Sequence, residues 1–359
     1  MPTKVYSEPD CIWNHREEIA ALGKKALIIT GHSSAQKNGS LADIRKALSD
    51  KDTSCVLFQE IEENPSVETV MKAAKLGRDA GADFVIGIGG GSALDAAKAI
   101  ALMVQNRDSD ASVLFQPLPL RALPVVAVPT TCGTGSEVTQ YAILTRHDIR
   151  TKQGISHSIF PVLSFVDYRY LKGAPVGLIT STAIDALAHF IESYFNTRAT
   201  TYSRMLCLHG LAIWGTEKKA LLTKEISDEA LRCLLDASTY AGMAIAHTST
   251  TIPHGASYYL TYEKQIPHGL AVGTYLPSYL KLQTNQEEVV MLVQLMGFTD
   301  LEDFETFIRA IVGTIQLPEE EIHTIEEQLI ANKRKLPLCP FETSEKNLRF
   351  MVSSSLDKL

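Results

Sequence analysis

The sequence predicts an α/β protein of two domains, with a parallel sheet and its helices first and an all-helical domain second. In the first half, short apolar runs alternate with helical stretches, which is the pattern of βαβ units. From Leu178 onward the apolar residues follow a helical period and no strand pattern is visible. The change comes near Asp167, so we expect an α/β domain over residues 1–169 and a helical domain over residues 170–359.

Four strands are expected in the first domain, each from a short β-rich run. They cover residues 25–30, 55–58, 83–88 and 124–128. The helices of this domain are expected over residues 40–48, 67–80 and 93–104. Right-handed crossovers then place the carboxyl ends of the strands along one edge, where ligands bind.

Seven helices are expected in the second domain, several of them separated by proline or glycine. They cover residues 178–195, 202–222, 228–247, 269–282, 287–295, 301–315 and 319–331.

The composition excludes several classes of protein. A chain of 359 residues with 45% hydrophobic and 21% charged residues is long enough for two full cores. Its net charge of −7 argues against a nucleic-acid surface. No apolar run reaches the roughly 18 residues that cross a bilayer, and the first residues lack the apolar core of a signal peptide. The six cysteines show no paired spacing, which favours reduced thiols and a cytoplasmic location.

A run of three glycines is the first candidate binding element. Gly89, Gly90, Gly91 and Ser92 follow a predicted strand and open a predicted helix. Backbone N–H groups there can approach a ligand closely, and the helix N-terminus favours an anion such as a pyrophosphate. The G-x-G-x-x-G fingerprint is absent. The alternative is a tight turn with close packing of helix against sheet.

A second loop, residues 129–137, also follows a predicted strand and is rich in hydroxyls and glycines. Such a loop can donate hydrogen bonds to a ribose or a phosphate. It can equally be an ordinary polar loop.

Four side chains are candidate ligands of one metal ion: Asp185, His189, His254 and His268. Asp185 and His189 are spaced i, i+4, which places both on one face of a helix. His268 follows His254 by fourteen residues. One carboxylate and three imidazoles suit Fe²⁺, Zn²⁺ or another divalent ion, and the set can leave a position open for substrate. By itself, an Asp-x-x-x-His pair is more often a solvated helix pair.

Taken together, these segments resemble the iron-containing (group III) alcohol dehydrogenase family, and its shorter bacterial members in particular. The resemblance rests on residues 25–31, residues 63–66, Gly89–Ser92 with Asp95 and Lys98, residues 129–139, residues 185–189, and His254 with His268.

The resemblance implies a Rossmann-like dinucleotide-binding domain followed by a helical metal-binding domain, the architecture of dehydroquinate synthase-like proteins. It implies that the four candidate residues are the metal ligands, and that Gly90, Gly91 and Ser92 hold the pyrophosphate. The other positions assigned to the cofactor site are Asn64, Asp95, Thr130, Thr131, Thr134 and Lys152. Without the resemblance, Lys152 would be taken as a solvated charge.

Two positions depart from the family pattern. Many NAD-using members carry an aspartate after the first strand, whereas this chain has Gly31, with Ser33, Ser34 and Lys37 close behind. Glycine removes the repulsion of a 2′-phosphate, which the hydroxyls and the lysine can bind, so NADP(H) is favoured over NAD(H). Tyr258 stands where many relatives have a histidine that is often proposed to relay protons. A phenol relays protons less readily near neutral pH, so this tyrosine is either a relay or a pocket residue.

His247 lies seven residues before His254, so on a continuous helix the two would share a face. A substrate contact is possible there, and a structural histidine is the more frequent case.

The function expected from the resemblance is a metal-dependent, NAD(P)-linked alcohol dehydrogenase or aldehyde reductase that acts on a small alcohol or aldehyde. Phosphonate- and sulfonate-bearing aldehydes are among the candidate substrates. One alternative is a dehydroquinate synthase-like lyase-cyclase, but the basic cluster that such an enzyme needs is not visible. The other is a non-enzymatic nucleotide sensor, against which the intact ligand set argues. Relatives commonly form homodimers, and we expect one here.

Overall fold

The computed structural model describes residues 2–359, which form two compact units that meet in sequence between Gly173 and Ala174. Unit 1 contains a parallel sheet with helices, and unit 2 is built almost entirely of helices, as the sequence predicts. The predicted boundary between residues 169 and 170 falls inside η4 (Tyr168–Leu171), a short 3₁₀ helix just after the last strand of the sheet.

The sheet of unit 1 has six strands in the order β1-β8-β5-β4-β2-β3, and every pairing is parallel. The strands are β1 (Lys4–Ser7), β2 (Lys25–Thr30), β3 (Ser54–Phe58), β4 (Phe84–Gly89), β5 (Val125–Pro129) and β8 (Leu163–Val166). In the central register, Ile86 of β4 lies between Ile28 of β2 and Val126 of β5. The inner strands are buried on both faces, which explains why they stand out as continuous apolar runs.

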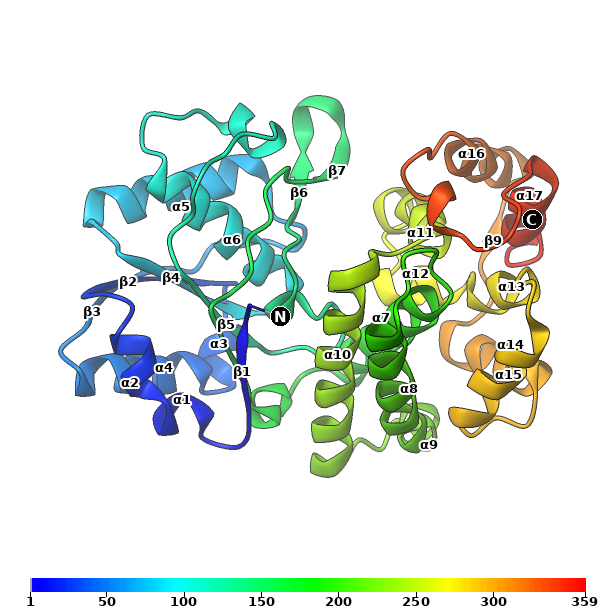
Figure 1. Ribbon diagram of the computed structural model, residues 1–359, viewed down its shortest axis with the longest axis horizontal. Coiled ribbons are helices and arrows are strands. Elements are labelled where there is room, and N and C mark those ends of the chain that lie inside the picture. Colours follow the sequence, from blue (N-terminus) through cyan, green and yellow to red (C-terminus); the bar gives the residue numbers. More distant parts are fainter. Residues whose placement is uncertain (1) are drawn as a thin grey trace. The chain divides into compact units, whose positions relative to one another are not determined.

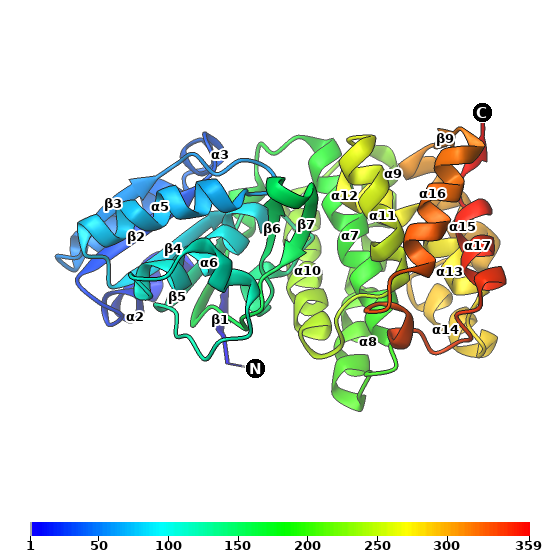
Figure 2. The ribbon, with the colours of Figure 1, turned by 90° about the horizontal axis from the view of Figure 1, so that it is seen from above.

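Helices cover both faces of this sheet (Figure 1). On one face lie α5 (Val67–Ala80) and α6 (Gly91–Gln105), which run over the strands in Figure 2. On the other lie α1 (Cys11–Asn14), α2 (Arg16–Ala20) and α4 (Ser40–Asp50). A hydrophobic core lies on each face of the sheet, and strand β2 contributes side chains to both. Leu27 and Ile29 pack into one core, and Ala26 and Ile28 pack into the other. The short helix α3 (Ser34–Lys37) follows β2, and η1 (Ala111–Phe115) precedes β5.

A small antiparallel hairpin follows the second loop and was not predicted. After η2 (Ser136–Val138), strand β6 (Ile143–Arg146) pairs with β7 (Thr151–Gly154) through η3 (His147–Ile149). Thr145 bridges to Ser66 and donates its N–H to the carbonyl of Pro65 at 2.8 Å. The hairpin is therefore attached to the segment that precedes α5.

Unit 2 is built around three long helices that pack against one another, α7 (Val176–Tyr194), α8 (Thr201–Thr216) and α10 (Asp228–Thr248). The remaining helices are α9 (Lys218–Thr223), α11 (Ile252–Glu263), α12 (His268–Gly273), α13 (Leu276–Lys281), α14 (Gln286–Leu295), α15 (Leu301–Val312), α16 (Glu319–Ile330), η5 (Leu336–Leu338) and α17 (Glu345–Ser353). Within the described residues, no helix is both long and apolar enough to span a membrane.

The expectation of no strand beyond Leu178 was wrong. Two-residue strands, β9 (Gln316–Leu317) and β10 (Asp357–Lys358), form a parallel pair that is too short to show any periodicity in sequence. The predicted helices over 202–222 and 269–282 are each two helices, and Pro277 lies in the first turn of the second helix of the latter pair. Helix α11 was missed because its buried face carries Pro253, His254 and Ser257, which hide the apolar period.

Candidate metal centre and dinucleotide loops

Helix α7 places the first two candidate ligands. It is buried along most of its length, and Asp185 and His189 lie one turn apart on the same face. Their Oδ1 and Nε2 atoms are 3.7 Å apart. Both residues are buried, at 3% and 5% exposure, so the carboxylate is removed from water and depends on its protein neighbours.

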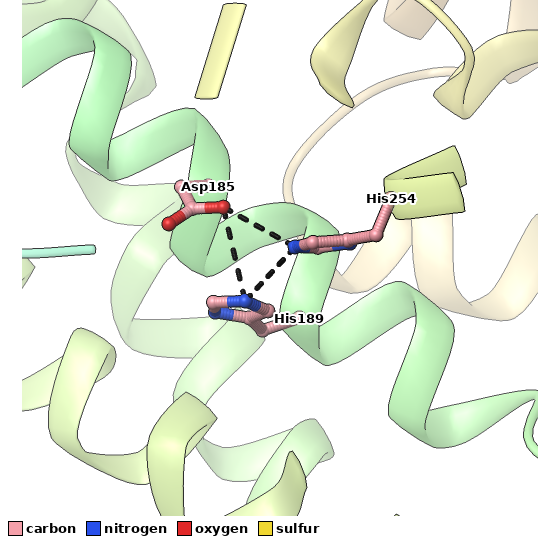
Figure 3. Close-up of side chains that lie close together, drawn as sticks. All are labelled: Asp185, His189 and His254. Carbon is pink, nitrogen blue, oxygen red and sulfur yellow. Dashed lines mark hydrogen bonds and ion pairs between the residues drawn. The ribbon is translucent and has the colours of Figure 1, made fainter. Parts of the chain in front are cut away.

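His254 joins them from the first turn of α11 (Figure 3). Its Nε2 lies 3.1 Å from Nε2 of His189 and 3.4 Å from Oδ1 of Asp185. The two imidazoles are stacked, with ring centroids 4.8 Å apart. Ligand atoms of Asp185, His189 and His254 all lie within 4.8 Å of one another, as a shared ion would require.

His268 is the first residue of α12 and stands at the edge of this group. Its Nε2 is 3.8 Å from Oδ1 of Asp185, and its side chain is 37% exposed. The next residue, Gly269, allows α12 to approach α7 closely, because a Cβ there would lie 1.8 Å from the carbonyl oxygen of Ser181. The fourth predicted ligand therefore depends on a glycine for its position.

The chemistry of this donor set fits a divalent cation. Oδ1 of Asp185 is buried and has no hydrogen-bond partner among the described residues, yet three imidazole nitrogens face it at 3.4, 3.7 and 3.8 Å. Burial alone would raise the pKa of Asp185, but the three histidines hold it well below its usual range. Although burial opposes it, Glu192 and Asp185 raise the pKa of His254 to about 9. The carboxylates and the imidazoles thus stabilise one another's charged forms.

Glu192 is a member of this site that sequence reasoning missed. It is fully buried on α7, and its Oε2 accepts a hydrogen bond from Nδ1 of His254. Its Oε1 accepts from the backbone N–H and the hydroxyl of Thr251, at 2.7 and 2.8 Å. The signal was its position seven residues after Asp185, which returns to the same helix face.

Tyr258 and His247 differ in their relation to the centre. Tyr258 lies one turn after His254 on α11 and is 42% exposed. Desolvation of its hydroxyl, with the charges of Glu192 and Asp185, raises the pKa of Tyr258 to about 12. His247 is exposed near the end of α10. This helix ends at Thr248, and Ser249 is not helical, so α10 and α11 are separate helices. The continuous helix on which it would share a face with His254 does not exist.

In unit 1, the glycine loop and the second loop pack directly together. Gly90 is the N-cap of α6, and a Cβ on it would lie 3.1 Å from the side chain of Thr131. A Cβ on Gly91 would lie 2.7 Å from Cγ2 of Thr134. Thr130 donates its N–H to the carbonyl of Gly89 at 3.0 Å. These contacts explain why glycines occupy the start of α6.

Three further residues that were predicted to bind the cofactor, Asn64, Ser92 and Lys152, meet at the glycine loop. The N–H of Asn64 donates to Oγ of Ser92 at 3.1 Å, and Nζ of Lys152 donates to Oδ1 of Asn64 at 2.8 Å. Asn64 has a φ of 57°, a left-handed conformation that asparagine tolerates better than most residues. The hairpin thus brings Lys152 to the start of α6, across a long stretch of sequence.

Asp95 and Lys98 hold the second loop against α6. Asp95 accepts from the hydroxyl of Ser136 at 2.5 Å and from the N–H of Ile143 at 2.9 Å. Lys98 is fully buried and donates to Oγ of Ser136 and to the carbonyl of Tyr141, both at 2.7 Å. Burial lowers the pKa of Lys98 to about 8 against the opposing charge of Asp95. Through these contacts Asp95 holds the second loop in place beside α6.

The residues assigned to cofactor choice lie together at the carboxyl end of β2. Gly31 directly follows the strand, and Ser33, Ser34 and Lys37 are exposed in and beside α3. Because β2 pairs with β4, this end of the strand lies at the same sheet edge as the glycine loop.

Sequence comparisons give the same family for both units. The family model described as iron-containing alcohol dehydrogenase matches residues 2–168, and that of the C-terminal domain of the Fe-containing alcohol dehydrogenase family matches residues 179–319. Probable alcohol dehydrogenase EutG of Escherichia coli is 30% identical over 283 residues, which are 78% of this chain and 72% of that protein. The NADPH-dependent butanol dehydrogenase of Clostridium saccharobutylicum is 28% identical over 325 residues, 87% and 83% of the two chains.

Solved structures with the same fold cover nearly the whole chain. An iron-containing alcohol dehydrogenase from Thermotoga maritima is 36% identical with a TM-score of 0.91, covering 99% of this chain and 98% of its own. Sulfoacetaldehyde reductase from Bifidobacterium kashiwanohense, solved with NAD⁺, is 25% identical with a TM-score of 0.87, covering 98% and 96%.

Proposed function

Because the chain belongs to the iron-containing alcohol dehydrogenase family, we propose that it catalyses metal-dependent hydride transfer between a nicotinamide dinucleotide and a small alcohol or aldehyde. The observation that carries the proposal is the buried Oδ1 of Asp185, which has no hydrogen-bond partner among the described residues and which three imidazoles face within 3.8 Å. The metal, Fe²⁺ or else Zn²⁺ or another divalent ion, would be held by Asp185, His189, His254 and His268.

Each part of the chain has a separate task in this reaction. Bound at this centre, a divalent ion supplies Lewis acidity, which polarises a carbonyl and lowers the pKa of an alcohol. Asp185 supplies the negative charge that balances the cation, and the histidines supply neutral nitrogen donors. Tyr258, one turn from His254, either relays a proton or shapes the pocket; its pKa near 12 favours the protonated phenol at neutral pH.

The dinucleotide is proposed to bind at the edge of the sheet in unit 1. Gly90, Gly91 and Ser92 would hold the pyrophosphate with backbone N–H groups at the start of α6, where the helix dipole favours an anion. The remaining contacts are assigned to Asn64, Thr130, Thr131, Thr134 and Lys152, which surround the same turn. Asp95 supports this site through the second loop.

We propose NADP(H) in preference to NAD(H). The support is Gly31, which places no carboxylate after β2, together with the exposed Ser33, Ser34 and Lys37 beside it. One relative is named for NADPH and another was solved with NAD⁺, so the family includes both cofactors. With NADPH, the reaction would run from aldehyde to alcohol. A sulfonate- or phosphonate-bearing aldehyde is among the proposed substrates, because a sulfoacetaldehyde reductase shares this fold at 25% identity.

A cytoplasmic homodimer is the proposed form of the protein. No disulfide joins the six cysteines, and β1 is an edge strand of the sheet. Light scattering should give twice the chain mass, and a strict monomer at micromolar concentration would contradict the dimer.

The test of the proposed function is a reconstitution assay. Metal-free protein is loaded with Fe²⁺ or Zn²⁺, and consumption of NADPH is followed with a panel of small aldehydes, sulfonate-bearing ones included. We expect turnover that requires the metal. A protein that binds the dinucleotide but reduces no aldehyde in any metal-loaded form would be a nucleotide sensor, and the proposal would fail.

A further inference from the structure

A fully buried carboxylate lies next to the metal centre without belonging to the proposed ligand set. Asp185, His189 and Glu192 are spaced i, i+4 and i+7 on α7, so they share one face of the helix. Asp185 and Glu192 are therefore about two turns apart, roughly 10 Å along the axis. The imidazole of His254 spans this interval, with Nδ1 at Glu192 and Nε2 toward Asp185 and His189.

Glu192 ties the beginning of α11 to α7. Thr251 is the N-cap of α11 and donates both its N–H and its hydroxyl to Oε1, while His254, in the first turn, donates to Oε2. Three donors satisfy a carboxylate that is cut off from water, which a charged group in this position requires. The contacts also orient the histidine ring, because Nδ1 of His254 and the backbone N–H of Thr251, three residues before it, are bonded to the same carboxylate.

The pattern of donors determines which nitrogen of His254 carries the proton. An ionised carboxylate can only accept hydrogen bonds, so Nδ1 must be protonated. In a neutral imidazole the other nitrogen, Nε2, then keeps its lone pair. Nε2 is the atom that faces Asp185 and His189. We propose that Glu192 is a positioning residue of the metal centre, which holds the ring and the tautomer of His254 that a metal ion needs.

This inference rests on the proposed function, since it assumes that the centre binds a metal. It adds a role for a residue that is not itself a ligand. Partners of this kind fix the orientation and the basicity of a ligating histidine, and their loss typically costs 10- to 100-fold in metal affinity.

Replacement of Glu192 by glutamine tests the role with almost no change in volume. The amide has one accepting oxygen and one donating NH₂ group, whereas Glu192 accepts at both oxygens. If the oxygen stays with Thr251, the NH₂ group faces Nδ1 of His254 and favours the tautomer with its proton on Nε2. If the oxygen turns to His254, the backbone N–H of Thr251 loses its acceptor.

The measurement is the dissociation constant of Zn²⁺ and of Co²⁺, determined by competition with a chelator on the full chain. We expect Glu192→Gln to weaken binding 10- to 100-fold. Glu326→Gln is the matched control, because Glu326 is also buried and accepts from Arg349 and Ser353 on α17, with no contact to a proposed ligand. Its metal affinity should equal that of the wild type.

The free energy of unfolding is also measured for each protein without metal. It shows whether Glu192→Gln loses metal affinity through a lost orientation of His254 or through a less stable fold. An affinity of folded Glu192→Gln within twofold of the wild-type value would overturn the inference and leave the proposed function intact. Absence of metal binding in the wild type would overturn the proposed function and the inference with it.

A second measurement needs no variant, so it decides the question even if Glu192→Gln fails to fold. In Zn²⁺-loaded wild type with ¹⁵N-labelled histidine, we expect the His254 ring to show a protonated Nδ1 and a metal-shifted Nε2. A proton on Nε2, or a metal shift on Nδ1, would overturn the role of Glu192.

Discussion

Replacement of Gly31 by aspartate is the sharpest test of cofactor choice. Gly31 directly follows β2, and its φ lies outside the left-handed region. A Cβ added there would meet the carbonyl oxygen of Ile61 at 3.4 Å, an ordinary van der Waals contact, and nothing closer. The aspartate should therefore fit without rearrangement, so that the change acts through its charge and its hydrogen bonds.

The expected size of the effect follows from the energy of charged hydrogen bonds. A carboxylate at position 31 would accept from a ribose hydroxyl of NADH and repel the 2′-phosphate of NADPH. A hydrogen bond to a charged group contributes about 1.5–3 kcal/mol, and each 1.4 kcal/mol is a factor of ten in affinity. Gly31→Asp should thus lower the ratio of kcat/KM for NADPH to that for NADH by roughly tenfold or more.

The assay compares kcat/KM for both cofactors at one ionic strength and at measured metal content. Gly31→Ala is the matched control, because it adds the Cβ without the charge and should keep the wild-type preference. Two results would refute the reasoning. One is a wild type that uses NADH as well as or better than NADPH, and the other is an unchanged ratio in a folded, metal-loaded Gly31→Asp variant.

Three further changes test the metal centre, the dinucleotide loop and a buried charge. His268→Ala should stay folded but lose bound metal and turnover, and full metal occupancy by elemental analysis would contradict its role as a ligand. Gly91→Ala should weaken dinucleotide binding in a fluorescence titration, because its Cβ would lie 2.7 Å from Cγ2 of Thr134, and an unchanged affinity would contradict the proposed role of the glycine loop. The pKa of Lys98 is lowered from 10.5 to about 8, so between these pH values the unfolded chain binds a proton that the folded chain does not. In denaturant titrations, wild type should therefore gain stability over Lys98→Met as pH rises from 8 toward 10, by up to about 1.4 kcal/mol per pH unit, and a difference that does not change with pH would contradict this.

The sequence was most informative where burial is complete. Strand β2 and helix α5 were predicted to the residue, because the strand is a continuous apolar run and the helix has a clear period between Ser66 and Gly81. Strand β1 was missed because it is an edge strand of only four residues. Strand β8 was missed because it is equally short and Pro161 and Ser164 interrupt the apolar stretch around it. Helix α11 was missed because Pro253, His254 and Ser257 interrupt the apolar period on its buried face.

The sequence predicted which residues belong to the candidate site, but not which of their side chains contact one another. The spacing of Asp185 and His189 fixes their relation on a helix, whereas the approach of His254 depends on how α11 packs. Glu192 had the right spacing on the same helix, yet nothing in sequence showed that it would meet Nδ1 of His254. Likewise, the contact between Lys152 and Asn64 depends on a hairpin that no pattern predicted.

The central claim is that one divalent ion is bound by Asp185, His189, His254 and His268. Anomalous diffraction at the zinc edge, from crystals of the protein loaded with Zn²⁺, tests it most directly. The account predicts a single strong peak about 2.0–2.2 Å from a carboxylate oxygen of Asp185 and from Nε2 of each histidine. A peak elsewhere in the chain, or an ion that His268 does not touch, would contradict it.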